Sequence, residues 1–193
     1  MAANQKVRII AGKWRSRQLR FADIPGLRPT GDRIRETLFN WLAPDIAGAR
    51  CLDLFCGSGA LCFEALSRGA AHCLAIEQNP KAIACLNESK NLLDANGLEI
   101  AQSDSPKQLR TPPETPFDIA FVDPPFDLNL INQVCNLLEE NQWIAKGGLV
   151  YCELPAQCSD FAPPANWQVL RNKVGGGVNY ILFSRIEPAT IFK

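Results

Sequence analysis

The tetrapeptide Asp123-Pro124-Pro125-Phe126 is the segment of this sequence with the clearest chemical meaning. It follows the apolar run FDIAFV (117–122), which is typical of a buried strand. Two successive prolines fix φ and remove two N–H donors, so the carbonyl groups of the segment are held in place before a ligand binds. The Asp123 carboxylate and the Pro124 carbonyl can each accept one hydrogen of an exocyclic amine, and the Phe126 ring offers a flat face to a base. The segment therefore predicts a site for a planar substrate that carries an amino group.

A glycine-rich turn, Gly57-Ser58-Gly59, follows a second apolar run, CLDLF (51–55), and precedes a predicted helix. Glycine allows the sharp turn and lets a ligand approach the backbone amides. Asp53 lies inside the apolar run, where a carboxylate is costly unless a ligand ammonium or the amides of the loop bond to it. The turn therefore predicts a second ligand site at the carboxyl end of its strand.

An acidic residue ends the next predicted strand, HCLAIE (72–77), and indicates a nucleoside ligand. Glu77 can accept both hydroxyls of a ribose, which holds equally for NAD and for S-adenosylmethionine. The dinucleotide fingerprint G-x-G-x-x-G is incomplete because Cys62 stands at its third glycine, and S-adenosylmethionine has no phosphate that requires it. Asp104 is a weaker candidate for contact with an adenine ring, and a solvated loop aspartate is the alternative. The candidate cofactor-binding residues are Asp53, Phe55, Gly57, Ser58, Gly59, Glu77, Gln78 and Asp104.

The formal net charge of zero hides a basic N-terminal segment. Residues 1–35 hold nine lysines and arginines against two aspartates, so the rest of the chain is acidic by the same amount. This asymmetry indicates either a polyanionic partner bound at one end or a solvated basic tail. Trp14 can stack a base or pack the segment onto the body. The candidate RNA-binding residues are Arg8, Lys13, Trp14, Arg15, Arg17, Arg28 and Arg33.

Short apolar strands alternate with helices from residue 51 onward, which predicts a parallel, doubly wound α/β sheet. Helices are expected from Thr30 or Asp32 to Pro44, over 59–68, from Asn79 to Gly97, and over about 128–141. Two strands joined by the Gly175–Gly177 turn predict a C-terminal antiparallel hairpin, and residues 6–21 predict a small N-terminal hairpin. We place a basic extension at 1–29 and the main domain at 30–193.

Length and composition exclude several classes of protein. The chain has 193 residues, of which 47% are hydrophobic and 21% charged, which is typical of one globular domain and not of a disordered chain. No apolar run reaches the length of a membrane helix, so we expect no membrane association and no secretion. The eight cysteines form no CxxC pair and His72 is the only histidine, so we expect reduced thiols, a cytoplasmic protein and no metal site.

The motifs together resemble the class I S-adenosylmethionine-dependent methyltransferases that modify exocyclic amines, whose last motif is (N/D)PP(Y/F). In order and spacing, four segments are similar to the RsmD family of bacterial guanine-N2 methyltransferases, which act on 16S rRNA. These segments are RIIAGKWRSRQL, RPTGDRIRETLFNWL, LDLFCGSGALCFEALSRGA and FVDPPF. Cys56 and Cys62 stand where the family has Ala and Gly.

The resemblance implies a Rossmann-like, mostly parallel seven-stranded sheet, S-adenosylmethionine as cofactor, and a target amine held by Asp123 to Phe126. It also implies small-subunit rRNA as partner, free or within a ribosomal subunit, and we expect a monomer. Three alternatives stay open. They are an amino methyltransferase acting on adenine or a protein glutamine, a non-catalytic RNA-binding assembly factor, and an NAD-dependent oxidoreductase.

Overall fold

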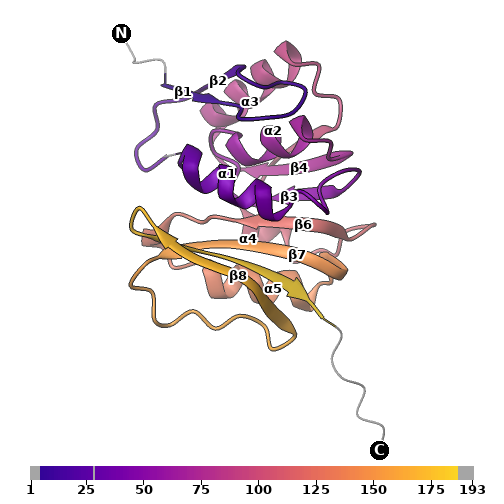
Figure 1. Ribbon diagram of the computed structural model, residues 1–193, viewed down its shortest axis with the longest axis vertical. Helices are drawn as coiled ribbons and strands as arrows, with labels where there is room; N and C mark the ends of the chain where they lie inside the picture. The colour runs from indigo at the N-terminus through magenta and orange to yellow at the C-terminus, as the bar shows by residue number, and fades with distance from the viewer. Residues whose placement is uncertain (1–4, 28, 187–193) are drawn as a thin grey trace, which may run out of the picture.

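A computed structural model describes residues 5–27 and 29–186 and contains two sheets and five α-helices within those ranges (Figure 1). The strands are β1 (Gln5–Arg8), β2 (Gln18–Phe21), β3 (Arg50–Asp53), β4 (His72–Glu77), β5 (Leu98–Gln102), β6 (Phe117–Val122), β7 (Ile144–Pro155), β8 (Trp167–Gly175) and β9 (Val178–Arg185). The helices are α1 (Asp32–Trp41), α2 (Ala60–Ser67), α3 (Pro80–Leu92), α4 (Ser105–Gln108) and α5 (Ile131–Glu140), with a 3-10 turn η1 (Phe126–Leu128). None of the helices in the described ranges is long and apolar enough to cross a membrane.

The main sheet has the strand order β5-β4-β3-β6-β7-β9-β8. The first five strands in this order are parallel, and β9 runs antiparallel to both β7 and β8. The predicted Rossmann-like sheet with a C-terminal antiparallel hairpin is confirmed. The chain leaves β3 in one direction for β4 and later returns on its other side as β6, so the strand order reverses at β3. In such sheets a ligand crevice lies beyond the carboxyl ends of the strands at this switch point.

Helices cover both faces of the main sheet. One face packs against α1, α2, α3 and the N-terminal hairpin, and the other packs against α4 and α5 (Figure 1). The apolar side of α1 carries Leu38 and Leu42, which are fully buried, and Trp41, which stacks on Tyr180 with ring centroids 5.5 Å apart. These contacts bury the apolar face of α1 and hold the helix against the main sheet.

Several predicted element boundaries are wrong by a few residues, for local reasons. Neither Thr30 nor Asp32 caps α1, because the N-cap is Gly31 and Asp32 is the first helical residue. Helix α3 begins as predicted, with Asn79 capping the Lys81 N–H, but it ends at Leu92 rather than near Gly97.

Two further boundaries differ near the ends of strands. Strand β3 stops at Asp53 instead of residue 55, whereas β6 covers the predicted run 117–122. Helix α5 begins at Ile131, after the turn η1, rather than near 128, and the short helix α4 was not predicted. The strand ends and η1 lie where the chain turns into the ligand crevice, so the periodic burial that marks an element is interrupted there.

The loop of the N-terminal hairpin is fastened to α2 by hydrogen bonds. The Lys13 N–H donates to the Ser67 carbonyl at 2.8 Å, and the Ser67 hydroxyl donates to the Ala11 carbonyl at 2.6 Å. Gly12 has φ +82°, and a Cβ there would lie 1.9 Å from the Ser67 carbonyl oxygen. Only glycine fits at this contact, so the hairpin and α2 are held at a fixed spacing.

A buried carboxylate, Glu64 of α2, joins the hairpin to α1. Its two oxygens accept from the Ile10 and Ala11 N–H groups at 2.7 and 3.0 Å, and from Arg68 at 2.7 Å. The Arg35 guanidinium of α1, which is also fully buried, lies 3.6 Å from it. Four partners therefore compensate the cost of burying this charge.

The variant Glu64→Gln tests this junction. Because it leaves the buried Arg35 without its Glu64 partner, we expect the free energy of unfolding to fall by about 3–5 kcal/mol. Urea denaturation followed by circular dichroism measures this. The control is Glu99→Gln, which removes the partner of His72 in a pair whose glutamate is exposed, and its cost should stay below about 1 kcal/mol. Equal losses in the two variants would contradict the role assigned to Glu64.

Candidate functional site

Four carboxyl groups meet at the carboxyl ends of the parallel strands. Asp53 ends β3, Glu77 ends β4, Asp123 follows β6, and Glu153 lies near the end of β7. The negative charge of Asp123 raises the pKa values of Asp53 and Glu153, and Glu77 adds to the effect on Asp53, so the groups share one electrostatic environment. The sequence-predicted residues Asp53, Glu77 and Asp123 are therefore brought together at the switch point.

The predicted glycine turn connects β3 to α2 and is tied to the tip of β4. Both oxygens of Glu77 are engaged, one by the Gly57 N–H at 2.9 Å and the other by the Asn79 N–H at 2.8 Å. Gly59 has φ +80°, and a Cβ on it would meet Phe63 at 2.7 Å and Leu86 at 2.8 Å. Glycine is thus required here, both for its backbone conformation and for the close packing of α2 and α3.

Asp53 is the buried residue of this turn that most needs a ligand. It is 3% exposed, and its Oδ2 atom has no hydrogen-bond partner among the described residues. Burial, and next the charge of Asp123, raise its pKa to about 7, while the N–H groups of Cys62 and Phe55 oppose the rise. An unsatisfied buried carboxylate oxygen at a strand end is suited to bind a cationic or N–H-bearing ligand.

The proline segment places Asp123 beside the cofactor turn. Burial raises the pKa of Asp123 to about 6, and a hydrogen bond from the Thr30 hydroxyl at 3.3 Å opposes the rise. The Thr30 carbonyl accepts in turn from the Arg35 Nε atom at 3.1 Å, so the buried arginine of α1 also positions Thr30. Pro124 is buried, whereas Phe126 is 44% exposed although it is a large apolar residue.

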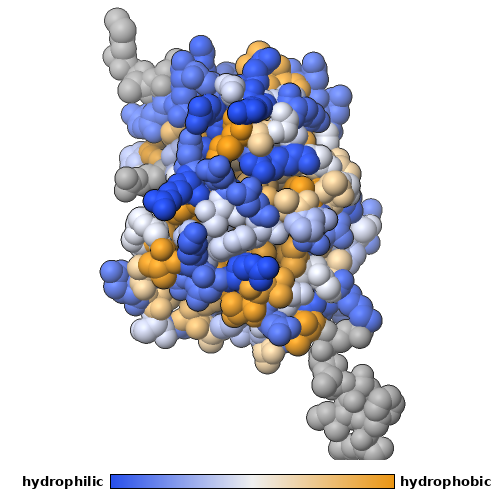
Figure 2. Space-filling model, viewed as in Figure 1, coloured by the Kyte–Doolittle hydropathy of each residue, from blue (hydrophilic) through white to orange (hydrophobic). Residues whose placement is uncertain are grey.

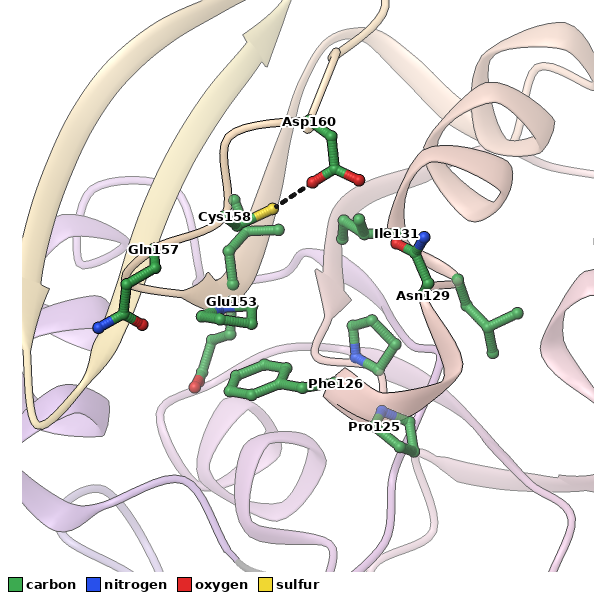
Figure 3. A pocket seen from close by; sticks show the side chains of 12 residues that line it. Pro125, Phe126, Asn129, Ile131, Glu153, Gln157, Cys158 and Asp160 are labelled. Atoms are coloured by element: carbon green, nitrogen blue, oxygen red, sulfur yellow. Dashed lines mark hydrogen bonds between the residues drawn. The ribbon is translucent and has the colours of Figure 1, made fainter.

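A cavity of about 270 Å³ opens next to this segment (Figure 3). Its lining includes Pro124, Pro125 and Phe126 of the proline segment, Glu153 and Pro155 of β7, and residues of the loop after β7. Figure 3 shows the side chains of Phe126 and Glu153 next to each other at the same end of the cavity. An aromatic face beside a buried carboxyl group is an arrangement suited to a planar base with N–H donors.

The thiols near the turn are closer together than the sequence spacing suggested. The Sγ atoms of Cys56 and Cys62 lie 3.4 Å apart, and Asp53 joins them in a group whose possible ligand atoms are all within 4.8 Å. A metal ion would require thiolates. The hydrogen bond to Cys62 and burial raise the pKa of Cys56 well above its usual range, and burial does the same for Cys62. The two thiols are therefore protonated and pack as small apolar groups.

The remaining predicted residues lie around this centre. Phe55 is half-buried after β3, Ser58 is buried and accepts from the Ala60 N–H at 3.3 Å, and Gln78 and Asp104 are exposed beyond β4 and β5. Their contacts with a cofactor stay predictions.

The predicted RNA-binding residues lie on and near the hairpin. Arg8, Lys13, Arg15, Arg17 and Arg33 are exposed, and Arg28 lies outside the described residues. Trp14 packs edge-on against Phe63 with centroids 6.3 Å apart, and Lys13 lies over its ring. Of the two roles considered for Trp14, the structure shows packing of the hairpin onto the body.

Two site residues were not found from the sequence. Thr30 was considered only as a helix cap, and Glu153 was counted as part of an apolar strand. A signal for Glu153 was present, because it is a charged residue inside the run GGLVYCELP, just as Asp53 is inside CLDLF. No pattern indicated Thr30, because its role depends on its hydrogen bond to Asp123, which lies 93 positions away in the chain.

Residues 7–184 match the family model described as Conserved hypothetical protein 95. The chain belongs to this family. A curated relative, Ribosomal RNA small subunit methyltransferase D of Escherichia coli, is 47% identical over 180 residues, which are 93% of this chain and 90% of the relative. A solved structure, a putative methyltransferase from Escherichia coli, is 45% identical and superposes with a TM-score of 0.89. The match covers 95% of this chain and 100% of that one.

More distant structures share the fold alone. One is an RNA methyltransferase from Salinibacter ruber, solved in complex with S-adenosyl-L-homocysteine. It is 17% identical to this chain, with a TM-score of 0.61, and the match covers 86% of this chain and 100% of that one. The resemblance inferred from the motifs is thus confirmed for this member of the Conserved hypothetical protein 95 family.

The raised pKa of Asp53 predicts a pH-dependent stability of the ligand-free protein. The folded state holds this proton up to about pH 7, whereas the unfolded chain releases it near the ordinary value of 3.8. The stabilisation is therefore complete at acid pH and is lost as the pH rises through 7. Between pH 5 and pH 8 the unfolding free energy of the wild type should therefore fall by this contribution. Asp53→Asn lacks the titrating group, so relative to the wild type it should gain about 2–3 kcal/mol of stability over the same pH range.

Urea denaturation at the two pH values measures this difference. The control is Asp118→Asn, near the start of β6 and away from the carboxyl ends of the strands. Its change in unfolding free energy between the two pH values should agree with that of the wild type within about 0.5 kcal/mol. A wild-type pH dependence that Asp53→Asn reproduces would show that Asp53 is ionised in the ligand-free protein.

Proposed function

We propose that this protein transfers a methyl group from S-adenosyl-L-methionine to the exocyclic N2 of a guanine in small-subunit rRNA. The observation that carries the proposal is the placement of Asp123-Pro124-Pro125-Phe126 at the switch point of the sheet, beside the unsatisfied carboxylate of Asp53. The family and its Escherichia coli relative, which is named a ribosomal RNA small subunit methyltransferase, support the reaction class and the RNA substrate.

The residues around the glycine turn fit the cofactor. Asp53 offers a free buried oxygen to an ammonium group, and Glu77 is placed to accept ribose hydroxyls in exchange for one of its present amide partners. The bound cofactor supplies a methyl group on a positively charged sulfur, and this charge offsets the negative charge of Asp53 and Asp123. The fold neighbour solved in complex with S-adenosyl-L-homocysteine supports a cofactor of this class.

The proline segment activates the acceptor amine by position. Guanine N2 is a weak nucleophile because its lone pair is delocalised into the ring. Two hydrogen bonds from N2–H, to Asp123 and the Pro124 carbonyl, favour a pyramidal nitrogen and direct its lone pair at the methyl group. Phe126 holds the plane of the base by stacking. Alignment of this kind can supply roughly 7–11 kcal/mol of the barrier reduction.

The Asp123 carboxylate, which holds the amine, can also accept the proton that leaves N2. The nitrogen becomes strongly acidic as it gains the methyl group, so no general base is needed before transfer. Burial raises the pKa of Asp123 to about 6, which lets its carboxylate take up the proton and release it to water near neutral pH.

The substrate base must reach a buried corner, so it is unpaired or flipped out of its helix. An RNA loop meets this need at the lowest cost. We propose that the basic segment of residues 1–29 binds phosphates around the target and that residues 30–193 form the methyltransferase domain. Figure 2 shows hydrophilic side chains gathered over the part of the surface where Figure 1 places β1, β2 and α1.

Methylation assays test the substrate class. Radiolabelled cofactor is supplied with free 16S rRNA, small ribosomal subunits, duplex DNA or cell protein, and the product is mapped by mass spectrometry. We expect one methylguanine in the rRNA, and transfer to free RNA or only to subunits decides the form of the substrate. Transfer to adenine or to a glutamine amide, and none to guanine, would overturn the proposal.

The variant Asp123→Ala tests the catalytic assignment. It removes an acceptor for the target amine, so transfer should fall by at least about 100-fold while RNA affinity stays within a few-fold. Single-turnover transfer and filter binding measure the two effects. Asp118→Ala, in the same strand but at its other end, should keep wild-type transfer. Unchanged turnover in Asp123→Ala would reject the mechanism.

The double variant Arg15→Ala/Arg17→Ala tests the basic segment. Loss of two phosphate contacts should weaken RNA binding at low salt and reduce the slope of log affinity against log salt by about 1.4–1.8. The control is Lys107→Ala/Arg110→Ala, which removes two exposed charges at α4 and the loop after it. An equal change of slope in both double variants would show that binding follows net charge and not the hairpin.

A further inference from the structure

Glu153 is a buried carboxyl group that the proposed transfer does not use. It lies near the end of β7, is 4% exposed, and lines the cavity together with Pro124, Pro125 and Phe126. A charged residue at such a place in a central strand requires partners. Tyr151 donates its hydroxyl to the Oε1 atom at 2.8 Å, and Thr30 contributes a further hydrogen bond. These partners hold the carboxyl group at one end of the cavity, beside the Phe126 ring (Figure 3).

The Thr30 hydroxyl has a single hydrogen, for which Asp123 at 3.3 Å and Glu153 compete, so Thr30 lies between Glu153 and the group proposed to accept the target amine. A base stacked on Phe126, with its amine at Asp123 and the Pro124 carbonyl, therefore presents the atoms next to that amine toward Glu153. In this placement one of the ring nitrogens bonded to the amine-bearing carbon can reach Glu153.

We propose that Glu153 selects guanine among amine-bearing bases by accepting the N1–H that neighbours the target amine. The inference rests on the proposed function and extends it from the reaction to the choice of base. In guanine, one ring nitrogen beside the amine carries a hydrogen. In adenine and cytosine, the ring nitrogen beside the amine carries a lone pair, which a carboxylate repels. Asp123, the prolines and Phe126 recognise any planar amine, so the distinction needs a group such as Glu153.

The charge of Glu153 fits this role once the site is filled. Burial and the charge of Asp123 raise its pKa to about 8 in the ligand-free protein. An N–H donor in contact with the carboxylate and a cationic cofactor nearby both favour the ionised form. The titratable groups around it are Asp123, Tyr151 and, opposite it on β9, Tyr180. The hydroxyl of Tyr151 is protonated because burial raises its pKa well above the usual range.

The variant Glu153→Gln is expected to replace the hydrogen-bond acceptor that faces the base with a donor. Since the Tyr151 hydroxyl donates to Oε1, the glutamine carbonyl takes that position and its NH₂ group faces the base. A donor now meets the N1–H of guanine, which is unfavourable, and would meet the lone pair of a base without that hydrogen, which is favourable. The variant should therefore change which base is preferred, and not only the rate.

The experiment compares two target bases that share the 2-amino group. Small-subunit rRNA is ligated from fragments so that the mapped position carries guanine or 2-aminopurine, whose N1 has a lone pair. Transfer is measured as kcat/KM. We expect the wild type to favour guanine by at least about 100-fold, because a site built for an N–H rejects an analogue that lacks it. In Glu153→Gln this ratio should fall below about 10, with 2-aminopurine transfer equal to or above the wild-type value.

Glu99→Gln is the matched control, since it makes the same chemical change in an exposed residue at the other end of the sheet. Its ratio should equal that of the wild type. Cofactor affinity from calorimetry and the circular dichroism spectrum show whether Glu153→Gln is folded. If it is not folded, Glu153→Asp, which keeps the acceptor, should retain the preference for guanine.

Each outcome separates the two proposals. Equal wild-type transfer to guanine and 2-aminopurine, or an unchanged ratio in folded Glu153→Gln, would overturn the role of Glu153 while leaving the guanine-N2 activity in place. A loss of the guanine preference in Glu153→Asp would do the same. An absence of wild-type transfer to either RNA would overturn the proposed function itself.

Discussion

The crevice at the switch point is organised by a cluster of carboxyl groups at the carboxyl ends of the parallel strands. Asp53, Asp123 and Glu153 are carboxyl groups with little access to water, and each raises or feels the charge of another. The parallel strands bring these groups together, because strands that run in one direction end at the same edge of the sheet. In the proposed function, a cationic cofactor and the N–H donors of the base would compensate the cost of ionising these carboxyl groups.

The N-terminal hairpin carries the opposite charge on its outer surface. Exposed arginines of the hairpin face solvent, while the hairpin itself is fixed to the body by Glu64 and by the contact between Gly12 and Ser67. Arg35 belongs to both halves, since it lies against Glu64 and also donates to the carbonyl of Thr30. The proposed phosphate-binding surface and the proposed base-binding corner are thus connected through one buried guanidinium.

The substrate corner is assembled from three distant parts of the chain. Thr30 comes from the loop before α1, Asp123 and the prolines follow β6, and Glu153 comes from β7. In the proposed function each part contributes a different property: the prolines fix the direction of the carbonyl groups, Phe126 supplies a stacking face, and the carboxyl groups supply hydrogen-bond acceptors. Asp123, the prolines and Phe126 would hold any planar amine, and the proposed role of Glu153 adds the choice of base.

The sequence by itself determined the features that depend on near neighbours in the chain. Apolar runs of five or six residues predicted β4, β5 and β6 at their observed bounds, or within one residue, and Asn79 with Pro80 predicted the start of α3, because periodicity and capping act over one or two turns. The glycine turn and the proline segment were legible for the same reason. Only the tertiary structure decided that Trp14 packs on Phe63, that Gly31 caps α1, and that Thr30 and Glu153 join the site. Most of these contacts join residues that are far apart in the chain, and the start of α1 depends on how the preceding loop packs on the rest of the protein. A local pattern of residue types cannot predict either.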